Sequence, residues 1–139
     1  MTATSAPLPV PAIGAPLPTY LVTALDGEQV AAYAAASGDR NPIHLDEDAA
    51  RAAGLPGTIV HGMLIMGQFE AALRGWRPEC RIETMQTRFL RPLAVGGGLR
   101  IEGRVAKIET EAPLRLIVRL MVRDGAGTPI CVGDARVGL

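Results

Sequence analysis

The sequence has no net charge and almost no lysine, and both deficits limit what the protein can bind. Its 139 residues carry 14 basic and 14 acidic side chains, and Lys107 is the only basic residue that is not arginine. A chain with balanced charge lacks the broad positive surface that nucleic acid binding requires. We therefore expect no nucleic acid partner, and we expect any phosphate group to be bound by arginine, which binds phosphate in a bidentate fork.

Cysteine and early basic residues are also scarce. Cys80 and Cys131 lie far apart and outside any C-x-x-C pattern, so they predict two buried thiols in a reducing compartment. No lysine or arginine precedes Arg40, which argues against a secretory or transit peptide, and no apolar run reaches membrane-spanning length. These absences predict a cytoplasmic protein without a membrane partner.

Proline is concentrated at the start of the chain, where five of the first 18 residues are proline. Such a stretch has few side chains that a packed element can use. We predict a flexible or extended lead-in over residues 1–12 and a single domain over residues 13–139, which is long enough to bury its own core.

Three segments have the features of helices. Asp26 is a predicted N-cap for a helix that Gly38 ends, and Asp46 is a predicted N-cap for a short helix over residues 47–53. Residues 62–75 carry apolar side chains on nearly every face, which predicts a buried helix that is surrounded by protein.

Downstream of residue 80 the hydrophobic period changes from helical to two, as strands require. The clearest alternation runs from Leu114 to Val122, and residues 82–90, 99–105 and 130–137 show similar patterns. Residues 20–23 are a further short candidate. One buried helix followed by four successive antiparallel strands predicts an α+β fold in which a curved sheet is wrapped around a central helix.

The chemistry is concentrated in residues 37–44, Ser-Gly-Asp-Arg-Asn-Pro-Ile-His. On an unbroken helix, Asp39 and His44 would point about 140° apart, but Asn41-Pro42 disfavours a helix here and favours a turn. We predict that this break lets the two side chains converge. The alternative is that Asp39 and Asn41 are ordinary turn residues and that His44 is a loop histidine. Because five identities are fixed within seven positions, a chance match at average usage is about one in a few million.

This segment resembles the signature of the MaoC-like, (R)-specific enoyl-CoA hydratase and dehydratase family. The resemblance includes Tyr33 and Ala50 on either side of the segment, residues 59–64 (Ile-Val-His-Gly-Met-Leu) and residues 88–93 (Arg-Phe-Leu-Arg-Pro-Leu); Ala36 is a mild departure. It implies a hotdog fold and reversible syn addition of water to trans-2-enoyl thioesters in fatty acid metabolism. It also implies an acyl-CoA or acyl-carrier-protein (ACP) substrate, no metal or redox cofactor, and a homodimer or higher homo-oligomer.

The resemblance also implies roles for single residues. Asp39 and His44 match the catalytic pair, and the Gly62 amide is the expected donor to the thioester oxygen. We assign Asn41, Arg88 and Arg91 to substrate binding, although arginines on strands are often simply solvated. His61 is expected to fix the start of the 62–75 helix, because no third or fourth metal ligand lies at a usable spacing from the two histidines.

Two other functions remain open. The same chemistry on ACP substrates makes the protein a 3-hydroxyacyl-ACP dehydratase. From a different class, the chain could be a non-catalytic subunit that binds acyl thioesters. Thioesterase activity is disfavoured because hydrolysis has no use for a water held over C3. The sequence does not predict the acyl chain length.

Overall fold

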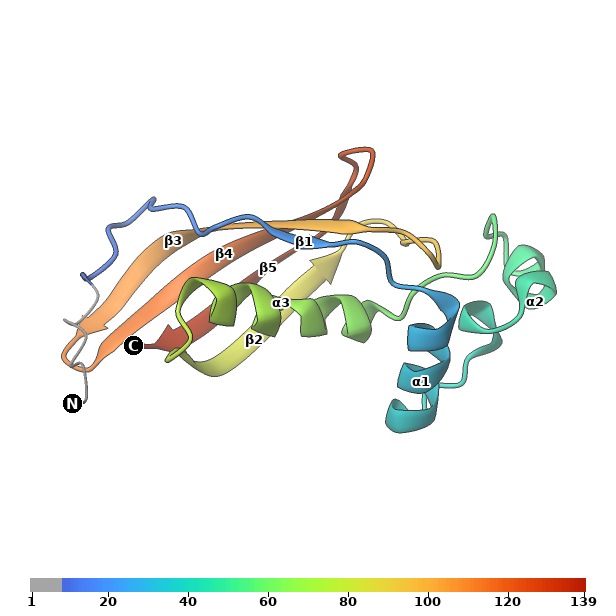
Figure 1. The fold of residues 1–139 in the computed structure, drawn as a ribbon, viewed down its shortest axis with the longest axis horizontal. Coiled ribbons are helices and arrows are strands. Elements are labelled where there is room, and N and C mark those ends of the chain that lie inside the picture. Colours follow the sequence, from blue (N-terminus) through green and yellow to red (C-terminus); the bar gives the residue numbers. More distant parts are fainter. Residues whose placement is uncertain (1–8) are drawn as a thin grey trace, which may run out of the picture.

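The computed structural model describes residues 9–139 and contains one antiparallel sheet with helices on one face and at one end (Figure 1). The strands are β1 (Tyr20–Val22), β2 (Arg81–Phe89), β3 (Leu99–Glu111), β4 (Leu114–Asp124) and β5 (Pro129–Gly138). The helices are α1 (Gly27–Ser37), the 3₁₀ turn η1 (Pro42–His44), α2 (Glu47–Ala52) and α3 (Gly62–Trp76). The strand order is β1-β3-β4-β5-β2, with every neighbouring pair antiparallel.

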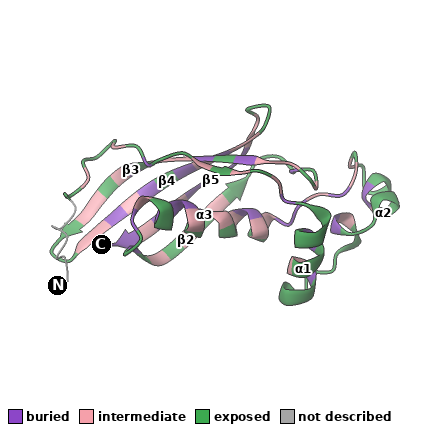
Figure 2. Ribbon diagram, in the orientation of Figure 1, coloured by how far each residue is buried: buried purple, intermediate pink, exposed green. Residues whose placement is uncertain are grey.

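The core lies between α3 and the inner face of the sheet. The helix buries Ile65, Phe69 and Leu73, which are spaced four residues apart and so lie on one face. On β4, alternate side chains from Leu116 to Val122 are fully buried, as the alternating sequence predicted. Figure 2 shows buried residues along the strands of the sheet and at intervals along α3. The predicted α+β arrangement of a sheet and a packed central helix is confirmed.

The expectation that α3 is buried on all sides is wrong for the single chain. Met63 is 55% exposed, and Gly67 is exposed one turn further on. One sheet covers only one side of a helix, so the apolar residues on the other side of α3 remain accessible in the monomer.

Strand β3 is longer than the predicted 99–105 segment because it continues to Glu111. Its pairing with β4 shifts register between Val105 and Lys107 and again between Ile108 and Thr110. A bulge inserts an extra residue and breaks the period of two. For that reason the sequence pattern fades at residue 106 although the strand does not end there.

The described part of the proline-rich start is extended and lies along β3. The Gly14 amide donates to the carbonyl of Val105 at 2.7 Å, and the Leu17 amide donates to Gly103 at 2.8 Å. At the far end of α3, the guanidinium of Arg77, only 8% exposed, donates to the Pro9 carbonyl at 2.7 Å. The predictions for residues 1–8 lie outside the described residues, and the domain boundary at residue 13 stays a prediction.

The two cysteines are free and buried, and burial raises the pKa of both thiols. Within residues 9–139, no helix has the length and apolar character needed to cross a bilayer.

Candidate active site

The candidate site begins where α1 ends. A capping box between Asp26 and Gln29 starts this helix, and Gly38 ends it with φ 79°. That left-handed conformation suits glycine because a Cβ is strained there. The chain then turns into η1, where the Asn41 side chain accepts from the Ile43 amide at 3.3 Å. The predicted break at Asn41-Pro42 is therefore present as a turn in place of a continued helix.

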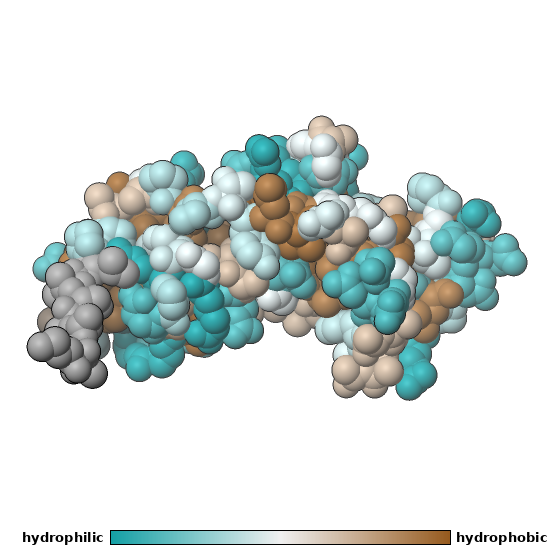
Figure 3. All heavy atoms as spheres, in the orientation of Figure 1, coloured by the Kyte–Doolittle hydropathy of each residue, from teal (hydrophilic) through white to brown (hydrophobic). Residues whose placement is uncertain are grey.

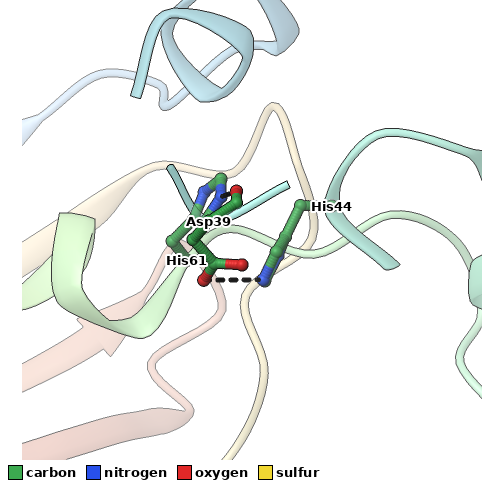
Figure 4. Close-up of side chains that lie close together, drawn as sticks. All are labelled: Asp39, His44 and His61. Carbon is green, nitrogen blue, oxygen red and sulfur yellow. Dashed lines mark hydrogen bonds and ion pairs between the residues drawn. The ribbon is translucent and has the colours of Figure 1, made fainter. Parts of the chain in front are cut away.

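This turn brings the two predicted catalytic side chains together. Asp39 Oδ2 lies 3.8 Å from His44 Nε2 (Figure 4). The His44 side chain is nearly buried, whereas that of Asp39 is 52% exposed. The gap is too long for a direct hydrogen bond, which requires about 2.7–3.2 Å. The predicted convergence is thus confirmed, with space between the two groups.

A second contact fixes the orientation and tautomer of His44. Its Nδ1 lies 2.7 Å from the carbonyl oxygen of Ile59. A carbonyl only accepts, so Nδ1 carries the proton and donates. In the neutral ring, Nε2 is then the acceptor, and it is Nε2 that faces Asp39. The pair therefore presents two acceptor atoms to the space between them.

His61 also belongs to this site, although the sequence assigned it only to the start of α3. Its ring stacks on that of His44 with centroids 3.9 Å apart and planes 24° apart. Its Nε2 lies 3.0 Å from the backbone oxygen of Asp39, and the Tyr33 ring meets it edge-on with centroids 4.7 Å apart. The signal that could have shown this was the presence of both histidines within the resemblance. His44 is the last residue of η1, and His61 directly precedes α3.

The cluster of Asp39, His44 and His61 is a metal candidate by distance, since one ligand atom from each lies within 4.8 Å of the others. The orientation of the rings does not fit an ion, however. Imidazole binds a metal through a lone pair in the ring plane, at about 2.0–2.1 Å. Two rings stacked within 24° of parallel, with centroids 3.9 Å apart, do not direct their in-plane lone pairs at one point that close to both. The residues as arranged therefore do not form a metal centre.

Gly62 is the first residue of α3, where an amide has no intrahelical acceptor. No acceptor among residues 9–139 receives this amide. A Cβ at this position would come within 2.8 Å of the tip of the Phe89 ring, so the ring packs directly on the glycine. Glycine at position 62 allows this close approach of the ring tip, a contact that the sequence did not reveal.

A pocket of about 370 Å³ opens beside His44 and Gly62. Its walls are mainly apolar, and Arg91 is the one arginine among them. The lining residues are His44, Ile59, Val60, Gly62, Ile65, Phe89, Leu90, Arg91, Pro92 and Leu93.

The three predicted substrate-binding residues fall in different places. Arg91 lines this pocket, and Asn41 caps η1 at an exposed position. Arg88 lies on the opposite face of β2 from Phe89, since neighbouring residues of a strand alternate. It lines a separate hollow with Gln86 and Arg119 on the outer face of the sheet. The structure therefore does not bring Arg88 to the site pocket, and the binding roles of all three stay predictions.

The comparisons with known proteins bear on what this geometry is for. The MaoC-like domain profile matches residues 10–115, which include the turn, both histidines and the start of α3. The chain belongs to the MaoC-like domain family. The resemblance seen in the sequence is thereby confirmed.

Individual relatives add detail to this comparison. An (R)-specific enoyl-CoA hydratase from Aeromonas caviae is 35% identical over 101 residues, which are 70% of this chain and 75% of that protein. A mitochondrial 3-hydroxyacyl-ACP dehydratase from Arabidopsis thaliana is 35% identical over 69 residues, 50% of this chain and 42% of that one. The chain thus spans less than half the length of this plant relative, and 3% of each of two fungal fatty acid synthase β subunits that it also matches.

The fold comparison agrees with the sequence comparison. The structure of the A. caviae (R)-hydratase, which is involved in PHA biosynthesis, superposes with a TM-score of 0.83 at 27% identity and covers 99% of both chains. The predicted hotdog fold of MaoC-like hydratases is confirmed by this match.

Proposed function

We propose that the protein is an (R)-specific enoyl-thioester hydratase, which adds water reversibly to trans-2-enoyl thioesters. The observation that carries the proposal is the pair of acceptor atoms, Asp39 Oδ2 and His44 Nε2, held 3.8 Å apart at the edge of an apolar pocket. The reaction is a hydration in one direction and a dehydration in the other.

The spacing of the pair suits one water molecule. Two hydrogen bonds of about 2.8 Å that end on atoms 3.8 Å apart subtend about 85° at the water oxygen, about 20° less than the angle between its two protons, which slightly bent hydrogen bonds accommodate. The water donates one proton to each acceptor. Its oxygen lone pairs then remain free to attack a carbon atom.

The proton balance of the reaction follows from this arrangement. The water oxygen forms a bond to C3. The electron pair of the C2–C3 double bond moves to C2 and is shared with the thioester oxygen until C2 is protonated. One water proton passes to the Asp39–His44 pair, and the same pair returns a proton to C2. Both additions occur on the face that the pair occupies, which gives syn addition. General acid and base groups of this kind contribute about 10² to 10⁴ in rate. Because the two groups are coupled, the proton is assigned to the pair and not to either residue.

The Gly62 amide is the proposed donor to the thioester oxygen, on which negative charge develops. It lies at the N-terminus of a 15-residue helix and shares the pocket with His44. The free amide and the helix dipole both favour an anion there. Such a donor contributes about 10² to 10³ in kcat.

The apolar walls of the pocket suit an acyl chain, and Arg91 is the candidate contact for a phosphate of the carrier. CoA and the phosphopantetheine of ACP share the chemistry that such an arginine binds. The A. caviae relative is named for a CoA substrate and the plant relative for an ACP substrate. Dehydration of 3-hydroxyacyl-ACP is therefore the second candidate function.

We also propose that the protein works as a homodimer. Among residues 9–139, β2 pairs only with β5 and leaves its other edge open, and an open edge is a ready template for pairing with another chain. Exposed apolar side chains gather near that edge and the site, among them Met63, Phe89 and Leu90. Figure 3 shows further apolar atoms at the surface along the middle of the molecule. A second copy that covers these side chains would complete the pocket walls.

The test is the loss of the enoyl-thioester absorbance on mixing the purified protein with crotonyl-CoA, and then with longer trans-2-enoyl-CoAs. We expect loss of the band and formation of the (R)-3-hydroxyacyl product, with Asp39→Asn as the inactive control. Turnover of ACP thioesters alone would support the second candidate. Tight binding of acyl-CoA without turnover of either carrier would instead support a non-catalytic binding subunit.

A further inference from the structure

His61 buries a nitrogen atom that has no hydrogen-bond partner among residues 9–139, a cost in free energy that a purely structural residue at the start of α3 would avoid. The side chain is 1% exposed, and its Nε2 donates to the Asp39 carbonyl, since a carbonyl only accepts. In the neutral ring, Nδ1 is then an acceptor. That atom is buried without a hydrogen-bond partner among the described residues. Buried polar atoms without a partner are uncommon because they lose their bonds to water.

An apolar ring would avoid that cost while filling the same space. Phenylalanine keeps a flat ring against His44 and an edge contact to Tyr33, and it buries no nitrogen. The one contact of His61 that requires a nitrogen is the hydrogen bond to Asp39. The function of His61 is therefore to be sought in that bond.

The bond has a special place in the segment that carries Asp39. The other hydrogen bonds of residues 38–41 are local: Asp39 accepts from Asn41 through Oδ1, and its amide donates to Ser37 Oγ at 3.1 Å. Within residues 9–139, the His61 bond is the only hydrogen bond that ties residues 38–41 to a part of the chain beyond residues 34–44. The same imidazole stacks on His44. One ring thus contacts both members of the pair (Figure 4).

We propose that His61 is the positioning residue of the site: its N–H fixes the backbone at Asp39 and its ring face fixes the plane of His44, so that together they set the 3.8 Å gap. The proposal rests on the proposed hydration and adds to it the residue that holds the water-binding gap at its width. His61 itself touches neither water nor substrate in this mechanism.

Two substitutions separate the two contacts. His61→Phe keeps the ring and loses the donor, whereas His61→Gln keeps an N–H donor and loses the ring. We expect His61→Phe to lower kcat by about 10²-fold, the effect of a misplacement of about 1 Å. Its KM for enoyl-CoA should stay within about twofold, because the pocket is unchanged. His61→Gln should recover at least about tenfold of the lost kcat because its donor reaches the same carbonyl.

A double variant tests whether His61 acts through Asp39. Once Asp39→Asn has removed the carboxylate, adding His61→Phe should cost little further kcat, because effects on one unit are not additive. Multiplicative losses in the double variant would overturn the proposal. An unchanged kcat in His61→Phe, or a His61→Gln variant as slow as His61→Phe, would overturn it as well.

A crystallographic measurement keeps this test separate from the proposed function. If the wild-type protein hydrates no thioester, the proposed function fails, but the Asp39 Oδ2 to His44 Nε2 distance can still be compared between variants. A changed distance in His61→Phe, with a distance closer to the wild-type value in His61→Gln, would support the positioning role. The wild-type distance in both would contradict it.

Discussion

The sheet with α3 and the helical end of the molecule differ in what holds them together. In the sheet and α3, long runs of alternating or helically spaced side chains are fully buried. At the helical end, α1, η1 and α2 together bury only Val30, Ala34, His44 and Ala50. Yet Asp39 and His44 lie at the helical end. Stability and the proposed chemistry are therefore located in different regions, and residues 59–62 connect them through hydrogen bonds to both sides.

The sharpest test of this division is Asp39→Asn, which should remove activity without lowering stability. Asparagine keeps an oxygen that accepts from the Asn41 amide, as Oδ1 of Asp39 does. It cannot take a proton from water, so kcat should fall by about 10² to 10⁴. Thermal unfolding should stay close to that of the wild type. A large fall in Tm would place Asp39 in the stabilising part of the molecule and break the comparison.

Phe69→Ala should have the opposite effect, lowering stability while leaving the activity of the folded protein largely unchanged. Phe69 is fully buried on α3 against the sheet, and a Cβ at Gly133 would lie 3.0 Å from its ring. Removing a buried phenyl group of this kind costs about 3 to 5 kcal/mol in the free energy of unfolding. Urea unfolding measures the loss. In the folded fraction, kcat should remain within a few-fold of the wild type, and a far larger fall would show that the two regions are not separable.

Gly62 lies where the two regions meet, and a pair of variants isolates its amide. Gly62→Pro and Gly62→Ala both add a Cβ against Phe89, but only proline removes the N–H. Proline is tolerated at the first helical position, and the preceding His61 has ψ 131°, the extended value that a following proline requires.

We therefore expect Gly62→Pro to be slower than Gly62→Ala by about 10² to 10³ in kcat, the contribution of one oxyanion donor. Steady-state kinetics on crotonyl-CoA measure the ratio, and circular dichroism checks that α3 is retained in both. Equal rates would show that the Cβ, and not the amide, limits the reaction.

The smallest effect is expected from an ion pair of the sheet. Arg136 binds Glu109 through two hydrogen bonds of 2.9 Å, and these lower the pKa of Glu109 below its ordinary value near 4.5. A lowered pKa in the folded state stabilises the protein above the unfolded pKa, and this contribution is lost as the pH falls through the folded pKa.

Glu109→Gln should therefore lower Tm slightly at neutral pH, and the difference from the wild type should shrink as the pH falls below about 4.5 and vanish below the lowered pKa of the folded state. Glu111→Gln is the matched control, since Glu111 is exposed on the same strand and has no ion pair among the described residues. A Tm difference that persisted at pH 3 would assign the effect to packing.

The sequence predicted the elements whose side chains follow one period throughout. Strand β4 is alternating from end to end, and the first turn of α1 is marked by its cap at Asp26. The bulges in β3 interrupt its period, so its length could not be predicted. The apolar pattern on all faces of α3 led to the wrong prediction that the helix is buried on all sides. The sequence shows which residues are apolar, but not how many faces of the helix one sheet covers.

The candidate site was predictable only where neighbours in the chain make it. Asp39 and His44 meet because of a local turn, and that turn is visible as Asn41-Pro42. By contrast, the contacts of His61 with Asp39 and of Phe89 with Gly62 join residues 22 and 27 positions apart. Such contacts depend on how α3 and β2 are placed by the whole sheet, and no local pattern records them. Arg88 lies on the outer face because its neighbour Phe89 points inward and side chains alternate along a strand. The inward direction of Phe89 was not predicted either.

The position of Leu139 in the fold has a practical consequence for handling the protein. Leu139 follows the end of β5 and its amide donates to Leu114 at the sheet end, opposite α1 and η1 (Figure 1). A linker attached after Leu139 would leave from the side of the molecule remote from the Asp39–His44 pair. The protein could then be attached to a solid support through Leu139 with the Asp39–His44 pair facing the solution.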